Sequence, residues 1–359
     1  MPPYAPCSKL ENRIVGCLAA GAIGDTLGRP VEGWEYSRIE AEYGVLEDPF
    51  RSRDTAPDQL FPDDIGTDDT ALGMILCRAY LDKQGRVGPE DYARAWLKEM
   101  DPQYYWYCMA NTYELLRSGY SARAAGALNI VTGSGLMSVN PVAIFNAGDP
   151  ARAYHDALEL TSLFQRGLSI FVAGITASAL AEALRPGATV ESVLDTALHV
   201  APSQPVPTYN ERSPDNLRDA LREAVAIGQR HPDPLAMRAE ANEKLTQYQS
   251  FDCQETLQLA LAVFAAARGK PRTAIVGGAN IGRDTDTIAS LAGQFAGALH
   301  GFDGLPEDWR TAFLEQPGGR KLVAVGKDMA GLVKRKCERD GAIADSVLAM
   351  AGSSPQKNA

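Results

Sequence analysis

The sequence predicts an all-α protein that folds as one compact, multi-helix domain. Apolar residues recur at helical spacing in many segments, for example at Ile288, Leu291 and Phe295. No segment of useful length alternates apolar and polar residues in the manner of a half-buried strand. No repeat and no linker divides the 359 residues. We therefore expect one domain over residues 1–351 and a polar, disordered tail over residues 352–359.

Composition narrows the classes of protein that the chain can represent. With 45% hydrophobic residues it can bury a large core, and a formal charge of −10 argues against a nucleic-acid partner. The six cysteines form no C-x-x-C pair, so we expect reduced core thiols instead of a zinc site or disulfides. No basic segment precedes an apolar stretch, and no apolar run is long enough to span a membrane. We expect a cytoplasmic protein with no membrane contact, as a monomer or a small homo-oligomer.

The first helix is expected over residues 9–24, with small residues that allow neighbouring helices to approach closely. The pair Gly24 and Asp25 should end this helix. Asp25 is then either a cap for the next turn or an acid that orients a metal-bound water. Glu32 follows in a loop, and its residue type and place alone indicate only a solvent-exposed acid.

Residues 35–65 are rich in Asp, Pro and Arg and predict a long loop with one short helix. Loops of this length within a compact domain usually serve a function. The loop ends at residues 66–70, which read Gly-Thr-Asp-Asp-Thr and open an apolar helix over residues 71–80. Two adjacent acids with flanking threonines therefore stand at a helix start.

The middle of the chain offers two weaker signals. The aromatic run over residues 104–107 is typical of core packing, and the alternative is a wall of a substrate pocket. Gly133, Ser134 and Gly135 form a glycine-rich loop that can direct backbone N–H groups at a phosphate. Further helices are expected over residues 168–184, 190–201, 216–230 and 255–267.

The second acidic stretch covers residues 280–288 and reads Asn-Ile-Gly-Arg-Asp-Thr-Asp-Thr-Ile. The apolar residues that follow have helical spacing, so the acids again stand at a helix start, with Thr285 or Asp286 as the cap. The helix should end at Gly301. Its second face carries only alanine and glycine, which predicts a close contact with other helices.

A lone Asp-x-Asp at a helix start is usually only a cap. Two such starts in one chain offer hard oxygen ligands, which is what a pair of Mg²⁺ or Mn²⁺ ions needs. Without a cation, the clustered carboxylates would raise one another's pKa values. An EF-hand is excluded because Ile288 and Ala289 occupy its fifth and sixth positions. A phosphoaspartyl phosphatase motif should follow an apolar strand, whereas residues 277–280 read as a loop.

Three motifs, taken in their order along the chain, make the sequence resemble the ADP-ribosylglycohydrolase family, the relatives of dinitrogenase reductase activating glycohydrolase. They are Gly-Ala-Ile-Gly-Asp-Thr-Leu-Gly at residues 21–28, Thr-Asp-Asp-Thr at residues 67–70, and Asp-Thr-Asp-Thr at residues 284–287 with the small residues at 292–298. The similarity runs from about residue 10 to about residue 300. It departs from the family at Ser138, where relatives carry arginine, and at Ser162, where they often carry histidine.

The resemblance implies a complete set of site residues. Two Mg²⁺ or Mn²⁺ ions would be bound, with Asp286 as the bridge between them. The implied metal ligands are Thr67, Asp68, Asp69, Asp284, Asp286 and Thr287. The implied catalytic residues are Glu32, Asp69 and Asp25, and the implied substrate contacts are Gly133, Ser134, Gly135, Asn280 and Gly282.

The implied activity is hydrolysis of the ribosyl C1′ bond of an ADP-ribosylated protein or a ribosylated small molecule. The group attached to the ribose stays open at this stage. The alternatives are a hydrolase of a smaller nucleoside or N-riboside, a non-catalytic ADP-ribose-binding relative, and a phosphohydrolase that uses the same ions. All six implied metal ligands are present in the chain, which argues against the non-catalytic alternative.

Overall fold

The computed structural model describes residues 4–50, 65–204 and 216–351. These residues form seventeen α-helices and no strand, so the all-α prediction is confirmed. In chain order the helices are α1 (Lys9–Gly28), α2 (Tyr36–Tyr43), α3 (Asp68–Lys83), α4 (Pro89–Glu99), α5 (Tyr107–Arg117), α6 (Ser134–Met137), α7 (Asn140–Phe145), α8 (Pro150–Thr161), α9 (Leu168–Ala183), α10 (Val190–Val200), α11 (Leu217–Arg230), α12 (Pro234–Leu245), α13 (Cys253–Ala266), α14 (Pro271–Ala279), α15 (Thr285–His300), α16 (Glu307–Glu315) and α17 (Pro317–Met350).

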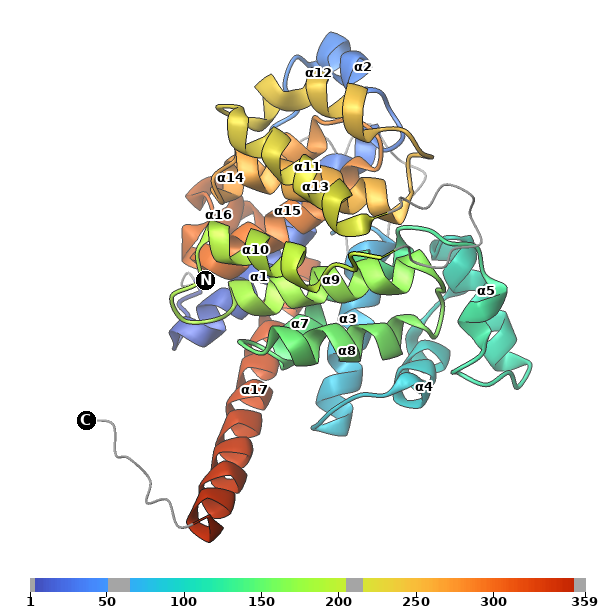
Figure 1. The fold of residues 1–359 in the computed structure, drawn as a ribbon, viewed down its shortest axis with the longest axis vertical. Coiled ribbons are helices and arrows are strands. Elements are labelled where there is room, and N and C mark those ends of the chain that lie inside the picture. Colours follow the sequence, from blue (N-terminus) through green and yellow to red (C-terminus); the bar gives the residue numbers. More distant parts are fainter. Residues whose placement is uncertain (1–3, 51–64, 205–215, 352–359) are drawn as a thin grey trace.

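Helices α1 and α15 form the centre of the fold and run antiparallel (Figure 1). Every residue of α15 from Thr285 to Ala298 is buried. The two backbones touch, because a Cβ on Gly28 would lie 2.3 Å from the carbonyl oxygen of Thr285. The hydroxyl of Thr285 also donates a hydrogen bond to the carbonyl oxygen of Gly28 at 2.8 Å. On the small-residue face, a Cβ on Gly297 would lie 2.2 Å from the carbonyl oxygen of Gly16, so the predicted close contact is confirmed.

The predicted end of the first helix at Gly24 and Asp25 is wrong. Helix α1 continues to Gly28 and passes into the short 3₁₀ helix η1 (Arg29–Val31). Gly24 serves the packing instead of a break, since a Cβ there would lie 2.3 Å from the carbonyl oxygen of Ala289. Asp25 consequently lies inside a fully buried helical turn.

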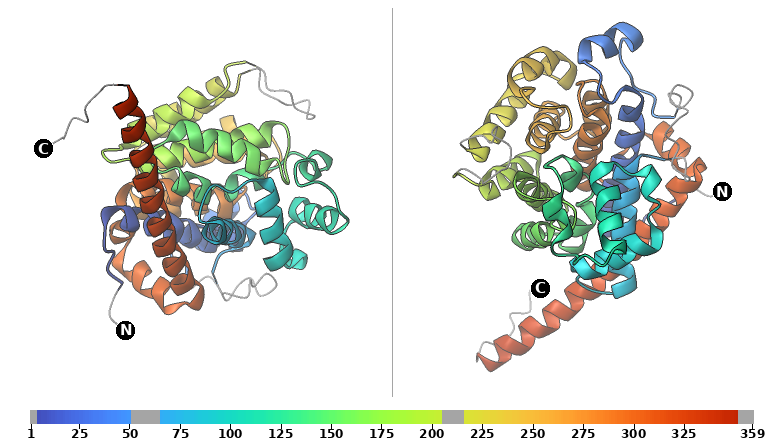
Figure 2. Two further views of the ribbon diagram at one scale, coloured as in Figure 1. Left: turned by 90° about the horizontal axis from the view of Figure 1, so that it is seen from below. Right: turned by 90° about the vertical axis from the view of Figure 1, so that its right-hand side faces the viewer.

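Helices α9 and α13 cover the central pair and are themselves almost completely buried. The first half of α17 packs on α1, and its buried residues end at Val333. Its second half extends away from the helical body, as Figure 1 and the right-hand view of Figure 2 show. No helix of the described residues is long and apolar enough to cross a membrane.

The long loop predicted over residues 35–65 contains the expected short helix, α2. Residues 51–64 of that loop lie outside the described part of the chain, as does the predicted tail. The domain boundaries at residues 1–351 stay a prediction.

Candidate active site with clustered carboxylates

Three helix ends meet where the acidic motifs lie. The antiparallel contact between α1 and α15 brings the end of α1 against the first residue of α15. The start of α3 joins them, because the backbone N–H of Gly66 donates a hydrogen bond to the hydroxyl of Thr26 at 2.9 Å. Residues from three distant parts of the sequence therefore lie close together in one buried region.

Asp25 joins the end of α1 to the start of α3. Its Oδ2 accepts hydrogen bonds from the backbone N–H groups of Thr67 at 2.9 Å and Thr70 at 3.2 Å, and from the Thr70 hydroxyl. Of the two roles considered for Asp25, a cap of the next turn is therefore wrong: it caps a helix that begins more than forty residues later. Its second oxygen, Oδ1, is buried without a hydrogen-bond partner among the described residues.

The first acidic motif occupies the first turn of α3, as predicted. Thr67 is the N-cap, and its side-chain oxygen accepts a hydrogen bond from the backbone N–H of Asp69 at 3.3 Å. Asp68 accepts one from the backbone N–H of Trp106 at 3.2 Å. Burial raises the pKa of Asp68 to about 7, with Asp25 and Glu32 adding to the rise. Burial and the charges of Asp25 and Asp68 raise the pKa of Asp69 well above its ordinary value.

The second acidic motif opens α15, but the expected cap is wrong. Asp284 occupies the N-cap position, and its side chain makes no capping hydrogen bond, while Thr285 and Asp286 lie inside the first turn of the helix. The Asp284 carboxylate accepts a hydrogen bond from the hydroxyl of Thr256 on α13 at 3.0 Å. Burial and the charge of Glu32 raise the pKa of Asp284 to about 7, and they raise that of Asp286 well above its ordinary value.

Glu32 lies with the acids of α15. One carboxylate oxygen from each of Glu32, Asp284 and Asp286 lies within 4.8 Å of the others. The Glu32 side chain retains solvent exposure, yet the protein atoms around its carboxylate raise its pKa, with Asp25 adding to the rise and Arg29 opposing it. Glu32 is thus an exposed acid, as its residue type and place indicated, but it lies within reach of the two acids of the second motif, and its catalytic role stays a prediction.

The donor set fits hard divalent cations. Asp69 Oδ2 and Asp286 Oδ1 are buried without a hydrogen-bond partner among the described residues, as is Asp25 Oδ1. Buried polar atoms are rarely left unpaired, and orphaned atoms of this kind often mark a place for an ion or water. All of the atoms that these acids offer are oxygens, which Mg²⁺ and Mn²⁺ prefer.

A comparison of the sequence with known protein families gives one match. The model of the family described as "ADP-ribosylglycohydrolase" matches residues 6–341. The chain belongs to the ADP-ribosylglycohydrolase family. It is accordingly an ADP-ribosylglycohydrolase-type enzyme, a hydrolase of glycosidic bonds.

Individual relatives are distant. The chain is 27% identical over 308 residues to the uncharacterized protein YegU of Escherichia coli K12, which covers 82% of this chain and 89% of the relative. It is 24% identical over 310 residues to the ADP-ribosylarginine hydrolase Tri1 of Pseudomonas putida GB-1, covering 83% of this chain and 73% of the relative. A solved "ADP-ribosylglycohydrolase-related protein complex" shares the fold with a TM-score of 0.65 at 20% identity, over 90% of this chain and 99% of that one.

Only part of the glycine-rich loop at residues 133–135 lies next to the clustered acids. A Cβ on Gly133 would lie 3.5 Å from Asp284 Oδ2, so this residue borders the site. Ser134 is buried and its hydroxyl accepts a hydrogen bond from the Thr132 hydroxyl at 3.1 Å. A Cβ on Gly135 would lie 2.6 Å from the Ser169 hydroxyl oxygen on α9. Gly135 thus allows α6 and α9 to pack, and its substrate contact stays a prediction.

Asn280 and Gly282 both contact other segments of the chain, and their substrate contacts stay a prediction. The Asn280 side chain is fully buried, accepts a hydrogen bond from the Leu46 N–H at 2.9 Å and donates one to the Leu46 carbonyl at 2.7 Å. Gly282 has φ of +85°, and a Cβ there would lie 2.7 Å from the backbone nitrogen of Tyr36. Both residues fix the segments after Glu32 to the second acidic motif.

The aromatic run at residues 104–107 borders the site instead of filling the core. Tyr104, Trp106 and Tyr107 are exposed, so the core-packing interpretation is wrong for these three. The Trp106 ring contacts the exposed ring of Phe251 with centroids 5.1 Å apart. The backbone N–H of Trp106 donates to Asp68, and the backbone N–H of Gly133 donates to the Phe251 carbonyl oxygen at 2.8 Å. The pair of rings therefore lies beside the acids.

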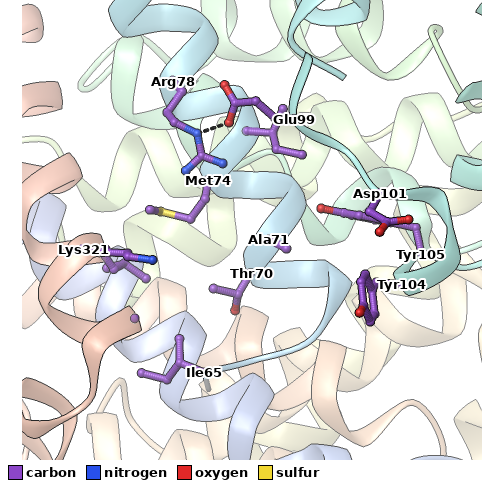
Figure 3. A pocket seen from close by; sticks show the side chains of 13 residues that line it. Ile65, Thr70, Ala71, Met74, Arg78, Glu99, Asp101, Tyr104, Tyr105 and Lys321 are labelled. Atoms are coloured by element: carbon purple, nitrogen blue, oxygen red, sulfur yellow. Dashed lines mark hydrogen bonds and ion pairs between the residues drawn. The ribbon is translucent and has the colours of Figure 1, made fainter. Parts of the chain in front are cut away.

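A separate cavity of about 360 Å³ lies between α3, residues 99–105 and α17 (Figure 3). The ion pair of Arg78 and Glu99 borders it, and Thr70 contributes to its wall while donating to Asp25. None of the implied ligands or catalytic acids lines this cavity. The carboxylate geometry therefore identifies the site, and the cavity is a different feature.

Sequence reasoning missed two residues of the site, Thr256 and Arg283. Thr256 is a polar residue in an otherwise apolar, buried helix, and that contrast was the available signal. Arg283 adjoins Asp284 in the motif itself, but its contacts involve segments far away in the sequence.

Proposed function

We propose that this enzyme hydrolyses the ribosyl C1′ bond of an ADP-ribosylated protein or an ADP-ribose-like small molecule with the help of two Mg²⁺ or Mn²⁺ ions. The observation that carries the proposal is the approach of the Glu32, Asp284 and Asp286 carboxylates within 4.8 Å. The unpartnered buried oxygens of Asp69 and Asp286 support it. Without positive charge close by, deprotonating such a cluster of acids at neutral pH costs free energy, because like charges repel.

The proposed ligands divide into two groups. Thr67, Asp68 and Asp69 would hold one ion, and Asp284 with Thr287 would hold the other. Asp286 would contact both. When bound, the ions supply positive charge for the ribose hydroxyls and for the attacking water.

The remaining steps belong to the side chains of the chain itself. Glu32 accepts a proton from the water that attacks C1′, a role that its raised pKa favours because it makes the carboxylate a stronger base. Thr256 and Trp106 hold the carboxylates of Asp284 and Asp68 in place through their hydrogen bonds. Asp25 fixes the start of α3 and thereby the direction of Asp69.

An ADP-ribosylated arginine is the first substrate to test, because the relative from Pseudomonas putida is named an ADP-ribosylarginine hydrolase. A smaller nucleoside or N-riboside is the second candidate. It is favoured by Ser138, which is buried at the position where relatives carry an arginine next to the distal part of the ligand. A cytoplasmic location is part of the proposal and is supported by six unpaired cysteines.

The test combines a substrate panel with metal titration. ADP-ribosylated peptides, ADP-ribose esters, nucleosides and phosphate esters are assayed with Mn²⁺. Asp68→Ala and Asp286→Ala should abolish turnover, and calorimetry should show weaker Mn²⁺ binding in both. Asp82→Ala, which removes an exposed acid of α3 paired with Lys98, is the control and should leave both properties unchanged. Wild-type stoichiometry retained in Asp286→Ala would contradict the metal assignment.

A further inference from the structure

Arg283 adopts an unusual backbone conformation directly before Asp284. Its φ is +72°, a left-handed value that only three non-glycine residues of the described chain adopt. Residues other than glycine, asparagine and aspartate rarely hold this conformation unless the surrounding structure imposes it. The contacts of Arg283 should therefore show what imposes it.

The backbone of Arg283 binds the loop that carries Glu32. The carbonyl oxygen of Arg283 accepts a hydrogen bond from the Gly33 N–H at 2.8 Å. Its own N–H donates to the carbonyl oxygen of Trp34, also at 2.8 Å. These two bonds lie on the residues that immediately follow Glu32 and immediately precede Asp284. They therefore determine how far apart the two carboxylates stand.

The side chain of Arg283 contacts α13 and the segment before it, and its Nη1 also lies 3.6 Å from Oε1 of the exposed Glu35. Its Nε donates to Glu255 Oε1 at 2.7 Å, and its Nη2 donates to the Tyr248 carbonyl at 2.6 Å. The Glu255 side chain is completely buried, and its Oε2 also accepts the Tyr248 N–H at 3.2 Å. A buried carboxylate with this arginine and a backbone N–H as partners is a rigid anchor.

The same turn of α13 also binds the next residue of the motif. Thr256, which follows Glu255, donates its hydroxyl to Asp284 at 3.0 Å. Consecutive residues of α13 therefore hold consecutive residues of the acidic motif. The guanidinium fixes residue 283 and the hydroxyl fixes residue 284, so the backbone between them cannot rotate independently.

We propose that Arg283, anchored by Glu255, is a positioning residue that holds the Glu32 loop and the Asp284 carboxylate at the separation needed for metal binding and hydrolysis. The inference deepens the proposed function and rests on it for the identity of the bound ions. Mutating a residue that holds a metal ligand in place, without touching the metal itself, typically weakens metal binding by about 10–100-fold.

The test uses the full-length protein and three variants. Arg283→Lys keeps the charge but loses the paired contacts to Glu255 and Tyr248. Arg283→Gly permits the same φ without a guanidinium, and Glu255→Gln keeps the shape of the anchor without its charge. Mn²⁺ affinity is measured by calorimetry, and amide hydrogen exchange of the Gly33 N–H is followed in the metal-free protein.

Arg268 supplies a matched control. It also has a positive φ, of +53°, and its guanidinium donates to the carbonyl oxygens of Gln229 and His231, outside the carboxylate cluster. We expect the Arg283 and Glu255 variants to weaken Mn²⁺ binding about 10–100-fold and to accelerate exchange at Gly33. Arg268→Lys and Arg268→Gly should do neither.

Two results would overturn the proposal. One is that Arg283→Lys and Glu255→Gln both show wild-type Mn²⁺ affinity and wild-type exchange of the Gly33 N–H. These two variants test the proposal even when Arg283→Gly does not fold. The other is wild-type behaviour of Arg283→Gly, which would mean that only the backbone conformation matters. Failure of the wild-type protein to bind Mn²⁺ would instead refute the proposed function, and the exchange of Gly33 would still test the anchor.

Discussion

The carboxylate of Asp25 accepts a hydrogen bond from the backbone N–H of Thr67 across 2.9 Å, although 42 positions separate the two residues in the chain. This bond joins the end of α1 to the start of α3, and the Thr70 N–H adds a second bond at 3.2 Å. The first acidic motif thus takes its position from a residue of the central helix. Asp25 is part of the architecture that collects the other acids.

Asp25→Ala should lower the free energy of unfolding of the Mn²⁺-saturated protein by about 1–3 kcal/mol, because it leaves buried N–H donors of α3 unpaired. Asp25→Asn should cost less, since its amide oxygen can still accept. Urea unfolding measures both. Asp149→Ala, which removes an exposed N-cap of α8, is the comparison for an ordinary cap. Equal stability of Asp25→Ala and wild type would show that these hydrogen bonds contribute nothing.

The stability of the metal-free protein should fall as the pH rises from about 4 to about 7. Burial raises the pKa values of Asp68 and Asp284 from 3.8 to about 7, so the folded protein keeps protons that the unfolded chain has released. Where the folded state binds more protons, the free energy of unfolding decreases with pH. The favourable contribution is complete below about pH 4 and lost above about pH 7.

Chemical denaturation in the presence of a chelator, at several pH values, measures this slope. Asp284→Asn removes one of the two groups and should make the slope shallower. Saturating Mn²⁺ should add stability that increases with pH, because the ions bind the deprotonated carboxylates. Identical curves with and without chelator at pH 8 would contradict a metal site.

Glu32→Gln and Asp284→Asn should separate proton transfer from ligand binding. Glu32→Gln should bind ADP-ribose with nearly wild-type affinity, but its kcat should fall by about 10²–10⁴-fold because the general base is lost. Asp284→Asn should lose affinity as well, since the ribose hydroxyls are proposed to bind through the ion that it holds. The measurements are kcat and ADP-ribose affinity with the substrate from the panel. Wild-type turnover in Glu32→Gln would remove Glu32 from the mechanism.

Gly24→Ala should destabilise the protein by about 1–3 kcal/mol, as overpacking in a core usually does. Its Cβ would lie 2.3 Å from the backbone oxygen of Ala289, and backbone cannot move aside as a flexible side chain does. Gly341→Ala is the matched control, because nothing lies within 4 Å of its Cβ on the exposed part of α17. That change should stabilise the protein by about 0.5–1 kcal/mol. Urea midpoints that move in the same direction would contradict the packing argument.

Much of the fold could be predicted from local patterns. Helical spacing of apolar residues identified α15, and Gly301 with φ of +77° ends it as expected. Acids at the starts of α3 and α15 were predicted because a helix start has exposed N–H groups wherever it occurs. These features depend on residues within one or two turns, so the sequence alone carried the information.

The order of the three motifs also predicted the family, and the family match over residues 6–341 confirms that prediction. The sequence could not say what the individual glycines and polar residues contact. Gly24 looked like a helix break and proved to be a packing contact with Ala289. The contact of the Asn280 side chain with the backbone of Leu46 was equally invisible in the sequence.

Only the tertiary structure decided how the acids are held together. Asp25 binds Thr67, Thr256 binds Asp284, and Arg283 joins Glu255 to the loop after Glu32. Each of these pairs spans 28 or more positions of the chain. Local periodicity determines which face of a helix is apolar, but the partner of a polar side chain depends on how whole helices pack. The sequence therefore determined the helices and the chemistry of their ends, and the packing of α1, α3, α13 and α15 determined the site.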